Sequence, residues 1–203
     1  MAVVKHFPGH GNVMGDTHLE IVHNDTDAET LRKTEYVPFR RVFDSGCGGL
    51  MTAHVIHDAF SKTPSTASYE IMTELLRNEM GFEGIAITDA MEMKGLSNLY
   101  PKGESAVRAI LAGCDILLYY GGKKDSVEEA MAAIYKAVED GVITEERIDE
   151  SYARIVKQKE RFDITSNEPD YELAKKIMYN EADIEENFAD KLSSITCIKK
   201  RTC

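Results

Sequence analysis

The residues best suited to chemistry lie near the start of the chain. A short apolar run leads into Lys5 and His6, a glycine-rich loop follows, and the triplet Asp16-Thr17-His18 ends the stretch. A buried strand that delivers polar side chains into a flexible loop is typical of an active site in an α/β protein. In an extended loop, Asp16 is close enough to His18 for its carboxylate to bond an imidazole nitrogen. By themselves, the two also fit ordinary polar residues of a loop.

A second carboxylate, Asp89, follows four apolar residues and a threonine at 84–88 and stands at the end of a predicted strand. An ionised carboxylate in this position is suited to attack an electrophilic carbon, and equally suited to cap the next helix. Glu92 is the rival carboxylate, and we interpret it as a surface or supporting residue. A lysine in an apolar strand is unfavourable unless it is paired or hydrated, which favours a functional role for Lys5.

Further histidines accompany these groups. We interpret His10, in the glycine-rich loop, as a structural anchor. His54 ends the second predicted strand and either lines the pocket or is a hydrogen-bonded histidine at its rim. The residues His6, His10, His18 and Asp16 are all of metal-ligating types, but their spacing matches no zinc signature. We therefore predict no metal site.

Apolar runs typical of buried strands alternate with helical patterns. After the opening strand, strands are predicted at 50–56, 84–88 and 115–120, and helices at 27–43, 69–80, 104–112, 125–140 and 144–162. Pro38 is expected to kink the first helix or divide it in two. This alternation predicts parallel βα units with polar residues at the carboxyl ends of the strands. Both a (β/α)₈ barrel and a doubly wound sheet place ligands there, so the pattern leaves the two open.

The motif KHFPGHG at residues 5–11, followed by Asp-x-His, resembles the signature of the family 3 glycoside hydrolases, in their β-N-acetylhexosaminidase branch. The resemblance continues through residues 51–54 and 87–91 and covers residues 2–162. It implies an α/β fold of the (β/α)₈ TIM-barrel type, of which residues 1–162 hold about the last four units, a half barrel. Residues 163–203 are then a linker and the start of a truncated second α/β domain, or a disordered tail.

The same resemblance implies a role for each polar residue. Asp89 is the nucleophile, His18 the general acid/base and Asp16 its dyad partner, while Lys5 and His6 hold hydroxyl groups of the sugar. The implied reaction is retaining hydrolysis of β-linked N-acetylglucosamine through a covalent glycosyl-Asp intermediate, without a cofactor. An imidazole titrates near pH 6.5, so it can donate a proton in the first step and accept one in the second.

The carbohydrate partner implied is a peptidoglycan or chitin fragment, as in peptidoglycan recycling. Two alternatives stay open. A histidine as proton donor is compatible with an anionic acceptor, and this fits a β-N-acetylglucosaminide phosphorylase. The chain also fits a non-catalytic half barrel that needs a missing amino-terminal partner. Four strands leave two open barrel edges, which predicts self-association.

Composition narrows the class of protein. The net charge of −11 argues against nucleic acid, which rewards clustered lysine and arginine. No apolar run approaches the roughly 20 residues of a membrane-spanning helix. The 4 cysteines form no CxxC pair, which favours free thiols in a reducing compartment such as the cytoplasm. No signal peptide pattern is found, and we expect the natural amino terminus to lie upstream of Met1.

Overall fold

The computed structural model describes residues 1–120, 124–164 and 170–178. The chain divides into two compact units, Met1–Ile164 and Thr165–Cys203. The second unit contains the helix α7 (Tyr171–Met178). Most of the stretch predicted as a linker and the start of a second domain, or a tail, lies outside the described residues, so the nature of this unit stays a prediction.

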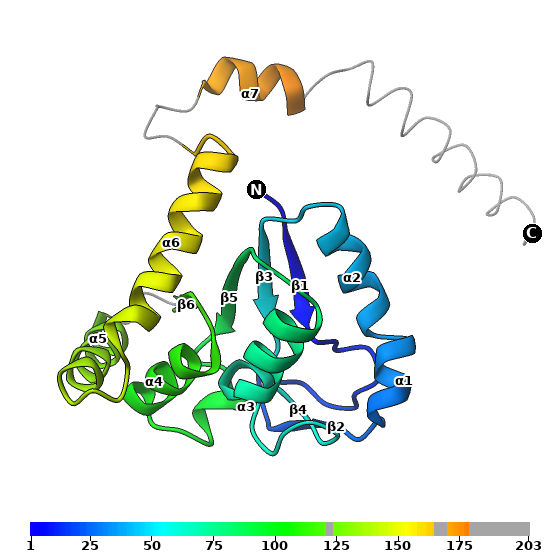
Figure 1. Cartoon of the computed structure of the whole chain (residues 1–203), viewed down its shortest axis with the longest axis vertical. Helices are drawn as coiled ribbons and strands as arrows, with labels where there is room; N and C mark the ends of the chain where they lie inside the picture. Colours follow the sequence, from blue (N-terminus) through cyan, green and yellow to red (C-terminus); the bar gives the residue numbers. More distant parts are fainter. Residues whose placement is uncertain (121–123, 165–169, 179–203) are drawn as a thin grey trace, which may run out of the picture. The chain divides into compact units, whose positions relative to one another are not determined.

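The first unit is built on a four-stranded parallel sheet. Its strands are β1 (Val3–Phe7), β3 (Gly49–Thr52), β5 (Ile85–Ala90) and β6 (Ile116–Leu118). They lie side by side in the order in which they occur in the chain, and β1, β3 and β5 run in one direction in Figure 1. A doubly wound sheet reverses its strand order at a switch point, whereas successive strands of a barrel stay adjacent. The half-barrel prediction is therefore confirmed.

Helices connect the strands of this sheet. Their bounds are α1 (Ala28–Lys33), α2 (Tyr36–Asp44), η1 (Ser65–Ala67), the π-type helix η2 (Glu70–Glu79), α3 (Lys94–Ser97), α4 (Lys102–Ala112), α5 (Lys124–Glu139) and α6 (Glu145–Arg161). The helix predicted at 27–43 is indeed divided, but at Thr34 and Glu35 rather than at Pro38. Pro38 lies in the first turn of α2, where its missing N–H would have no intrahelical partner in any case.

The strand predicted at 50–56 is also two strands. β3 ends at Thr52, and β4 (Val55–His57) pairs in parallel with β2 (Val22–Asn24) in a separate two-stranded sheet. Between them, the Ala53 amide donates to the carbonyl oxygen of Phe7 at 2.7 Å, and the chain turns away at His54. An apolar run does not reveal such a break, because both halves of the run are buried.

One face of the four-stranded sheet packs against the helices. Leu50 and Ala86 are fully buried in the core on this face. Alternate residues of each strand point to the opposite face, which would be the barrel interior. On that face Val3 and Leu118 are 37% and 38% exposed. Apolar side chains that would fill a closed barrel are thus in contact with solvent.

We expect the 203-residue chain to self-associate. Among the described residues, β1 and β6 each pair with only one neighbour, so both edges of the sheet carry unpaired backbone groups. Such edges pair readily with another chain, and apolar inner faces add to the attraction. Sedimentation velocity over a range of concentrations should show dimers or larger species. A monomer that stays stable at high concentration would contradict this prediction.

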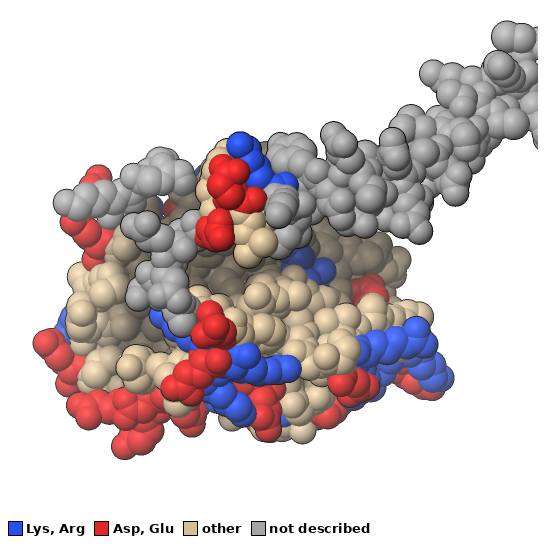
Figure 2. Space-filling view, turned by 90° about the horizontal axis from the view of Figure 1, so that it is seen from above, with Lys and Arg blue, Asp and Glu red and all other residues tan. Residues whose placement is uncertain are grey.

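Surface charges of both signs are interspersed. Seen from the amino ends of the strands, Lys and Arg side chains lie among Asp and Glu side chains, and the acidic ones predominate at the lower left (Figure 2). Arg32 and Arg40 both pair with Glu79 at 2.8 Å, and Lys157 pairs with Glu83 at 2.9 Å. Within the described ranges, no helix is long and apolar enough to cross a membrane.

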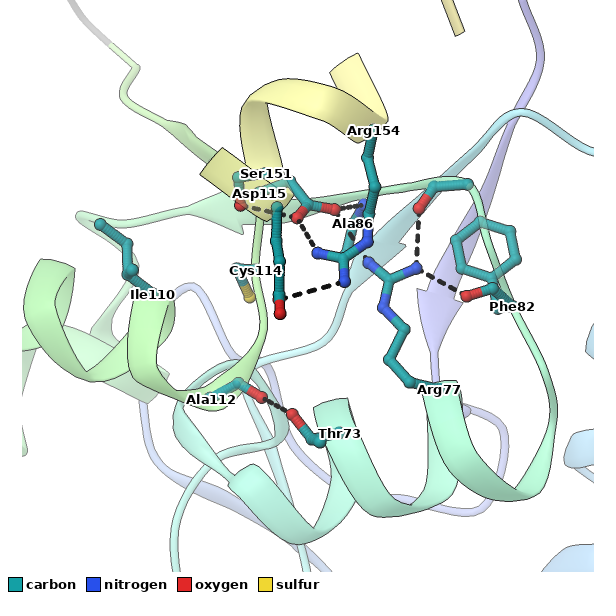
Figure 3. Close-up of polar contacts among 12 residues, drawn as sticks. Thr73, Arg77, Phe82, Ala86, Ile110, Ala112, Cys114, Asp115, Ser151 and Arg154 are labelled. Carbon is teal, nitrogen blue, oxygen red and sulfur yellow. Dashed lines mark hydrogen bonds and ion pairs between the residues drawn. The ribbon is translucent and has the colours of Figure 1, made fainter. Parts of the chain in front are cut away.

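A buried carboxylate, Asp115, joins α6 and η2 to the sheet (Figure 3). Its side chain is 0% exposed and accepts hydrogen bonds from the Arg77 and Arg154 guanidinium groups at 2.8 and 3.0 Å. The Ser151 hydroxyl and the Ala86 amide donate to it at 2.7 and 2.9 Å. Asp115 therefore links three elements through buried charged and neutral hydrogen bonds, a structural role that sequence inspection does not identify.

Replacing Asp115 by alanine should destabilise the first unit strongly. The change leaves the mostly buried Arg77 without its counter-charge, and breaking a buried pair in this way costs about 3–5 kcal/mol. Equilibrium urea unfolding at one fixed protein concentration measures the loss. Glu83→Gln removes an exposed ion pair with Lys157 and is the control, for which we expect little change. Equal stability of the two variants would contradict the role of Asp115.

Candidate active site

Two neighbouring strands and a loop bring the predicted residues together. His6 near the end of β1 places its Nε2 atom 3.6 Å from Oδ2 of Asp89 on β5. Oδ1 of Asp89 accepts a hydrogen bond from the Ala90 amide at 2.8 Å. Burial lowers the pKa of His6, an effect that the Asp89 charge opposes. The Asp89 carboxylate therefore has one oxygen held by the backbone and the other beside His6.

The loop after β1 carries a hydrogen-bonded carboxylate–imidazole pair. Nδ1 of His18 lies 2.6 Å from Oδ1 of Asp16, which also accepts a hydrogen bond from the His18 amide at 2.9 Å. These two bonds lower the pKa of Asp16. Because Asp16 occupies Nδ1, the opposite ring nitrogen, Nε2, is the atom left to exchange a proton with a ligand.

These groups surround one pocket of about 320 Å³. It is lined by His6, His10, Gly15, Asp16, Thr17, His18 and Asp89. Four of the five predicted site residues therefore share one pocket at the carboxyl end of the sheet. Lys5 does not line it and is exposed on the strand. The cost of burying a lysine, which suggested a function for Lys5, does not arise because this face of the half barrel is open.

The glycine-rich loop is held from outside the pocket by Glu35. This carboxylate accepts hydrogen bonds from the Asn12 amide and from the Asn24 side chain, both at 3.2 Å. Gly9 lies against Glu35 with a φ of 150°, a conformation that only glycine adopts readily. His10 contacts the Thr17 hydroxyl at 3.4 Å and also faces the pocket, so it combines the anchoring role with access to a ligand.

His54 is a buried, hydrogen-bonded residue and does not line the pocket. Its Nε2 donates to the Ala90 carbonyl oxygen at 3.0 Å, and its Nδ1 lies 2.8 Å from the Thr66 hydroxyl. Burial lowers the pKa of this ring. The sequence left two interpretations of His54 open, and the structure supports the one in which it is a hydrogen-bonded histidine at the rim. Glu92 lies outside the pocket as well, where it accepts a hydrogen bond from the Tyr120 amide at 3.1 Å.

No group of three or more metal-ligating residues is arranged around a common point within the ranges that the structure describes. Cys47 and Cys114 are free thiols, the first half-buried and the second buried. Cys197 and Cys203 lie outside those ranges.

The buried ring of His57, at the end of β4, should make stability depend on pH. Burial lowers its pKa from 6.5 to about 4; His10 adds to this shift, while the Gly9 carbonyl and Asp58 oppose it. Between these two values the unfolded chain binds a proton that the folded chain does not. The free energy of unfolding should therefore fall as pH decreases from about 6.5 to about 4, by about 3 kcal/mol in all.

Urea unfolding of the wild type and of His57→Leu across this pH range checks the prediction. His6 and His54 also have lowered pKa values, so both proteins should lose stability in acid. The stability of the variant should fall less steeply, because it lacks the contribution of His57. An equal dependence of the free energy of unfolding on pH in the two proteins would contradict the prediction.

The family of the chain is identified by comparison with known protein families. The model of the glycosyl hydrolase family 3 N-terminal domain matches residues 1–158. The chain belongs to this family, as its opening motif predicted. Its site is built at the carboxyl ends of parallel barrel strands, the place where barrel enzymes bind their substrates.

Individual relatives support the assignment of the chain to this family. The chain is 31% identical to "Beta-hexosaminidase A" of Pseudoalteromonas piscicida over an aligned length of 177 residues, and the match covers 78% of this chain and 30% of the relative. It is similar to the solved family 3 beta-N-acetylglucosaminidase of Paenibacillus sp. str. FPU-7, with 38% identity and a TM-score of 0.78, covering 82% of this chain and 32% of that one. The chain thus spans about a third of the length of these relatives.

A solved phosphorylase is also similar. The "Beta-glucoside phosphorylase BglX" matches with 27% identity and a TM-score of 0.77, covering 85% of this chain and 33% of the phosphorylase. Similarity of fold therefore extends to proteins named for hydrolysis and to one named for phosphorolysis.

Proposed function

We propose that this chain carries the catalytic groups of a retaining β-N-acetylhexosaminidase. The observation that supports this most directly is the pocket that unites the Asp16–His18 pair with Asp89. A carboxylate on one side and a proton donor on the other are what hydrolysis with retention requires. The names of the relatives, hexosaminidases and an N-acetylglucosaminidase, favour the same reaction.

In the first step, an oxygen of Asp89 attacks the anomeric carbon and forms a glycosyl ester. The glycosidic bond breaks, and Nε2 of His18 gives its proton to the departing oxygen. Asp16 stabilises the imidazolium before the transfer and keeps the ring in one orientation, as the carboxylate does in a serine-protease triad. His6, beside Asp89, is placed to hold a hydroxyl group of the sugar.

In the second step, the neutral His18 takes a proton from water. The resulting hydroxide attacks the anomeric carbon, the bond to Asp89 breaks, and the sugar leaves with its original configuration. One histidine serves as acid and then as base because the proton that it gives away in the first step is replaced by the one it takes from water in the second. The substrates proposed are β-linked N-acetylglucosaminides such as peptidoglycan or chitin fragments.

A phosphorylase is the second candidate, supported by the similarity to the beta-glucoside phosphorylase. Phosphate would then replace water in the second step and attack without needing a base. His18, neutral after it has given up its proton, would not repel this anion, whereas a carboxylate at the same place would.

The decisive experiment measures products with and without phosphate. The chain supplies four barrel strands, so we would assay it alone and in a barrel-completed form, defined as this chain fused behind the amino-terminal barrel half of the Paenibacillus relative. Nitrophenyl N-acetyl-β-glucosaminide should yield free N-acetylglucosamine of retained configuration. The sugar 1-phosphate as main product would favour the phosphorylase. An inverted product would contradict both.

We expect the chain alone to turn over slowly or not at all, because other residues that position the sugar would come from the remaining strands of the barrel. A folded barrel-completed form without any turnover would support the third possibility, a non-catalytic half barrel.

A further inference from the structure

The short helix α3, directly after the strand that carries Asp89, contacts the loop that carries the Asp16–His18 pair. The buried Gly95 of α3 donates its backbone N–H to the carbonyl oxygen of Thr17 at 2.9 Å. Thr17 stands between the two members of the pair and is 4% exposed. The backbone of the acid–base pair is thus tied to the segment that follows Asp89.

There is no space for a side chain at this contact. A Cβ atom at Gly95 would lie 2.9 Å from the His54 carbonyl oxygen and 3.2 Å from both the His54 Cβ and the Thr17 carbonyl oxygen. These are backbone atoms and the root of a side chain, so they cannot swing aside as the end of a flexible side chain can. Only glycine permits the three backbones to meet this closely.

The contact also reaches Asp89 through His54. The backbone of His54 packs on Gly95, while its ring donates to the carbonyl oxygen of Ala90 at 3.0 Å. The amide of Ala90 in turn donates to the Asp89 carboxylate at 2.8 Å. Gly95 therefore lies where the segments that carry His18 and Asp89 are held together.

We propose that Gly95 is a positioning residue that sets the place of the Asp16–His18 pair relative to Asp89. This rests on the proposed function of those residues, and Gly95 itself touches no substrate. An added methyl group would press on the backbones of both His54 and Thr17. Because two hydrogen bonds hold the buried His54 in the core, the loop that carries the exposed Asp16 and His18 side chains would yield, and His18 would move with Thr17. A misplacement of about 1 Å costs roughly 10²-fold in rate. The loss should concern proton donation and spare the nucleophile.

Kinetics of Gly95→Ala in the barrel-completed form test this. Hydrolysis of N,N′-diacetylchitobiose, whose leaving group needs a proton, should slow by about 10²-fold. The dinitrophenyl glycoside should lose far less in the step that forms the glycosyl-enzyme, because its leaving group is already a stable anion. The control is Gly11→Ala in the glycine-rich loop that leads to Asp16 and His18, where an added Cβ meets nothing within 4 Å. Equal losses on both substrates would overturn the proposal.

A second readout does not depend on turnover. Amide hydrogen exchange on the 203-residue chain should show that Gly95→Ala loosens residues 16–20, where Leu19 and Glu20 bond to the Asp16 carbonyl. The amides of the core strands should exchange as in the wild type. Unchanged exchange in the loop would overturn the proposal. A wild type without turnover would count against the proposed function alone, since the exchange experiment still decides the role of Gly95.

If Gly95→Ala fails to fold, Ser97→Ala replaces it. The Ser97 hydroxyl donates to the Glu92 carbonyl oxygen at 3.1 Å and holds α3 in place without crowding. Its loss should give a milder form of the same selective defect. A defect of equal size on both substrates would again overturn the proposal.

Discussion

Replacing Asp89 by asparagine should lower kcat/KM of the barrel-completed form by roughly 10⁴- to 10⁶-fold, the range found when a residue of a nucleophilic triad is removed. The amide cannot form the glycosyl ester, and it keeps the size of the side chain, so the fold should be retained. Glu92→Gln is the matched control because Glu92 lies three residues on but outside the pocket. We expect it to keep most of the activity.

A mechanism-based fluorosugar extends this test, because it traps the glycosyl-enzyme. Peptide mapping of the wild type should place the label on Asp89. A label on Glu92, or no label in a protein that turns over substrate, would contradict the assignment of the nucleophile.

Replacing His18 by alanine should slow hydrolysis by about 10²- to 10⁴-fold for substrates with poor leaving groups, which is the contribution of a general acid. For aryl glycosides whose leaving group is a stable anion, the step that forms the glycosyl-enzyme should change little. Measuring kcat/KM over a series of aryl leaving groups of decreasing acidity shows this as a steeper dependence on leaving-group pKa. An equal loss over the whole series would contradict the role of His18.

Asp16→Asn should reproduce part of this effect, since it removes the charge that stabilises the imidazolium. The chain offers a matched control in His23, which forms a second carboxylate–imidazole pair with Asp58 at 3.1 Å outside the pocket. His23→Ala should leave the leaving-group dependence unchanged. A similar change in His23→Ala would show that such pairs act through general stability.

Much of the architecture was accessible from the sequence, because strand and helix periods are local properties. The strand endings placed His6 and Asp89 at one edge of the sheet, and the resemblance of the opening motif to family 3 implied that Asp16 and His18 join them. The hydrogen bond between Asp16 and His18 needs only a bend of two residues, so the local sequence determines it. Order along the chain predicted adjacency once the resemblance favoured a barrel, in which successive parallel strands are neighbours.

The tertiary structure alone decided features that depend on contacts between distant residues. Asp115 is a hub only because Arg77 and Arg154, far away in the chain, converge on it. The break between β3 and β4 arises from pairing with β2, which leaves no mark on an apolar run. In the sequence, nothing distinguishes Gly95 from other glycines. Only the packing of His54 and Thr17 against it shows that no side chain fits there. Spacing along the chain carries information about local geometry, whereas the space left for one atom depends on every segment that packs there.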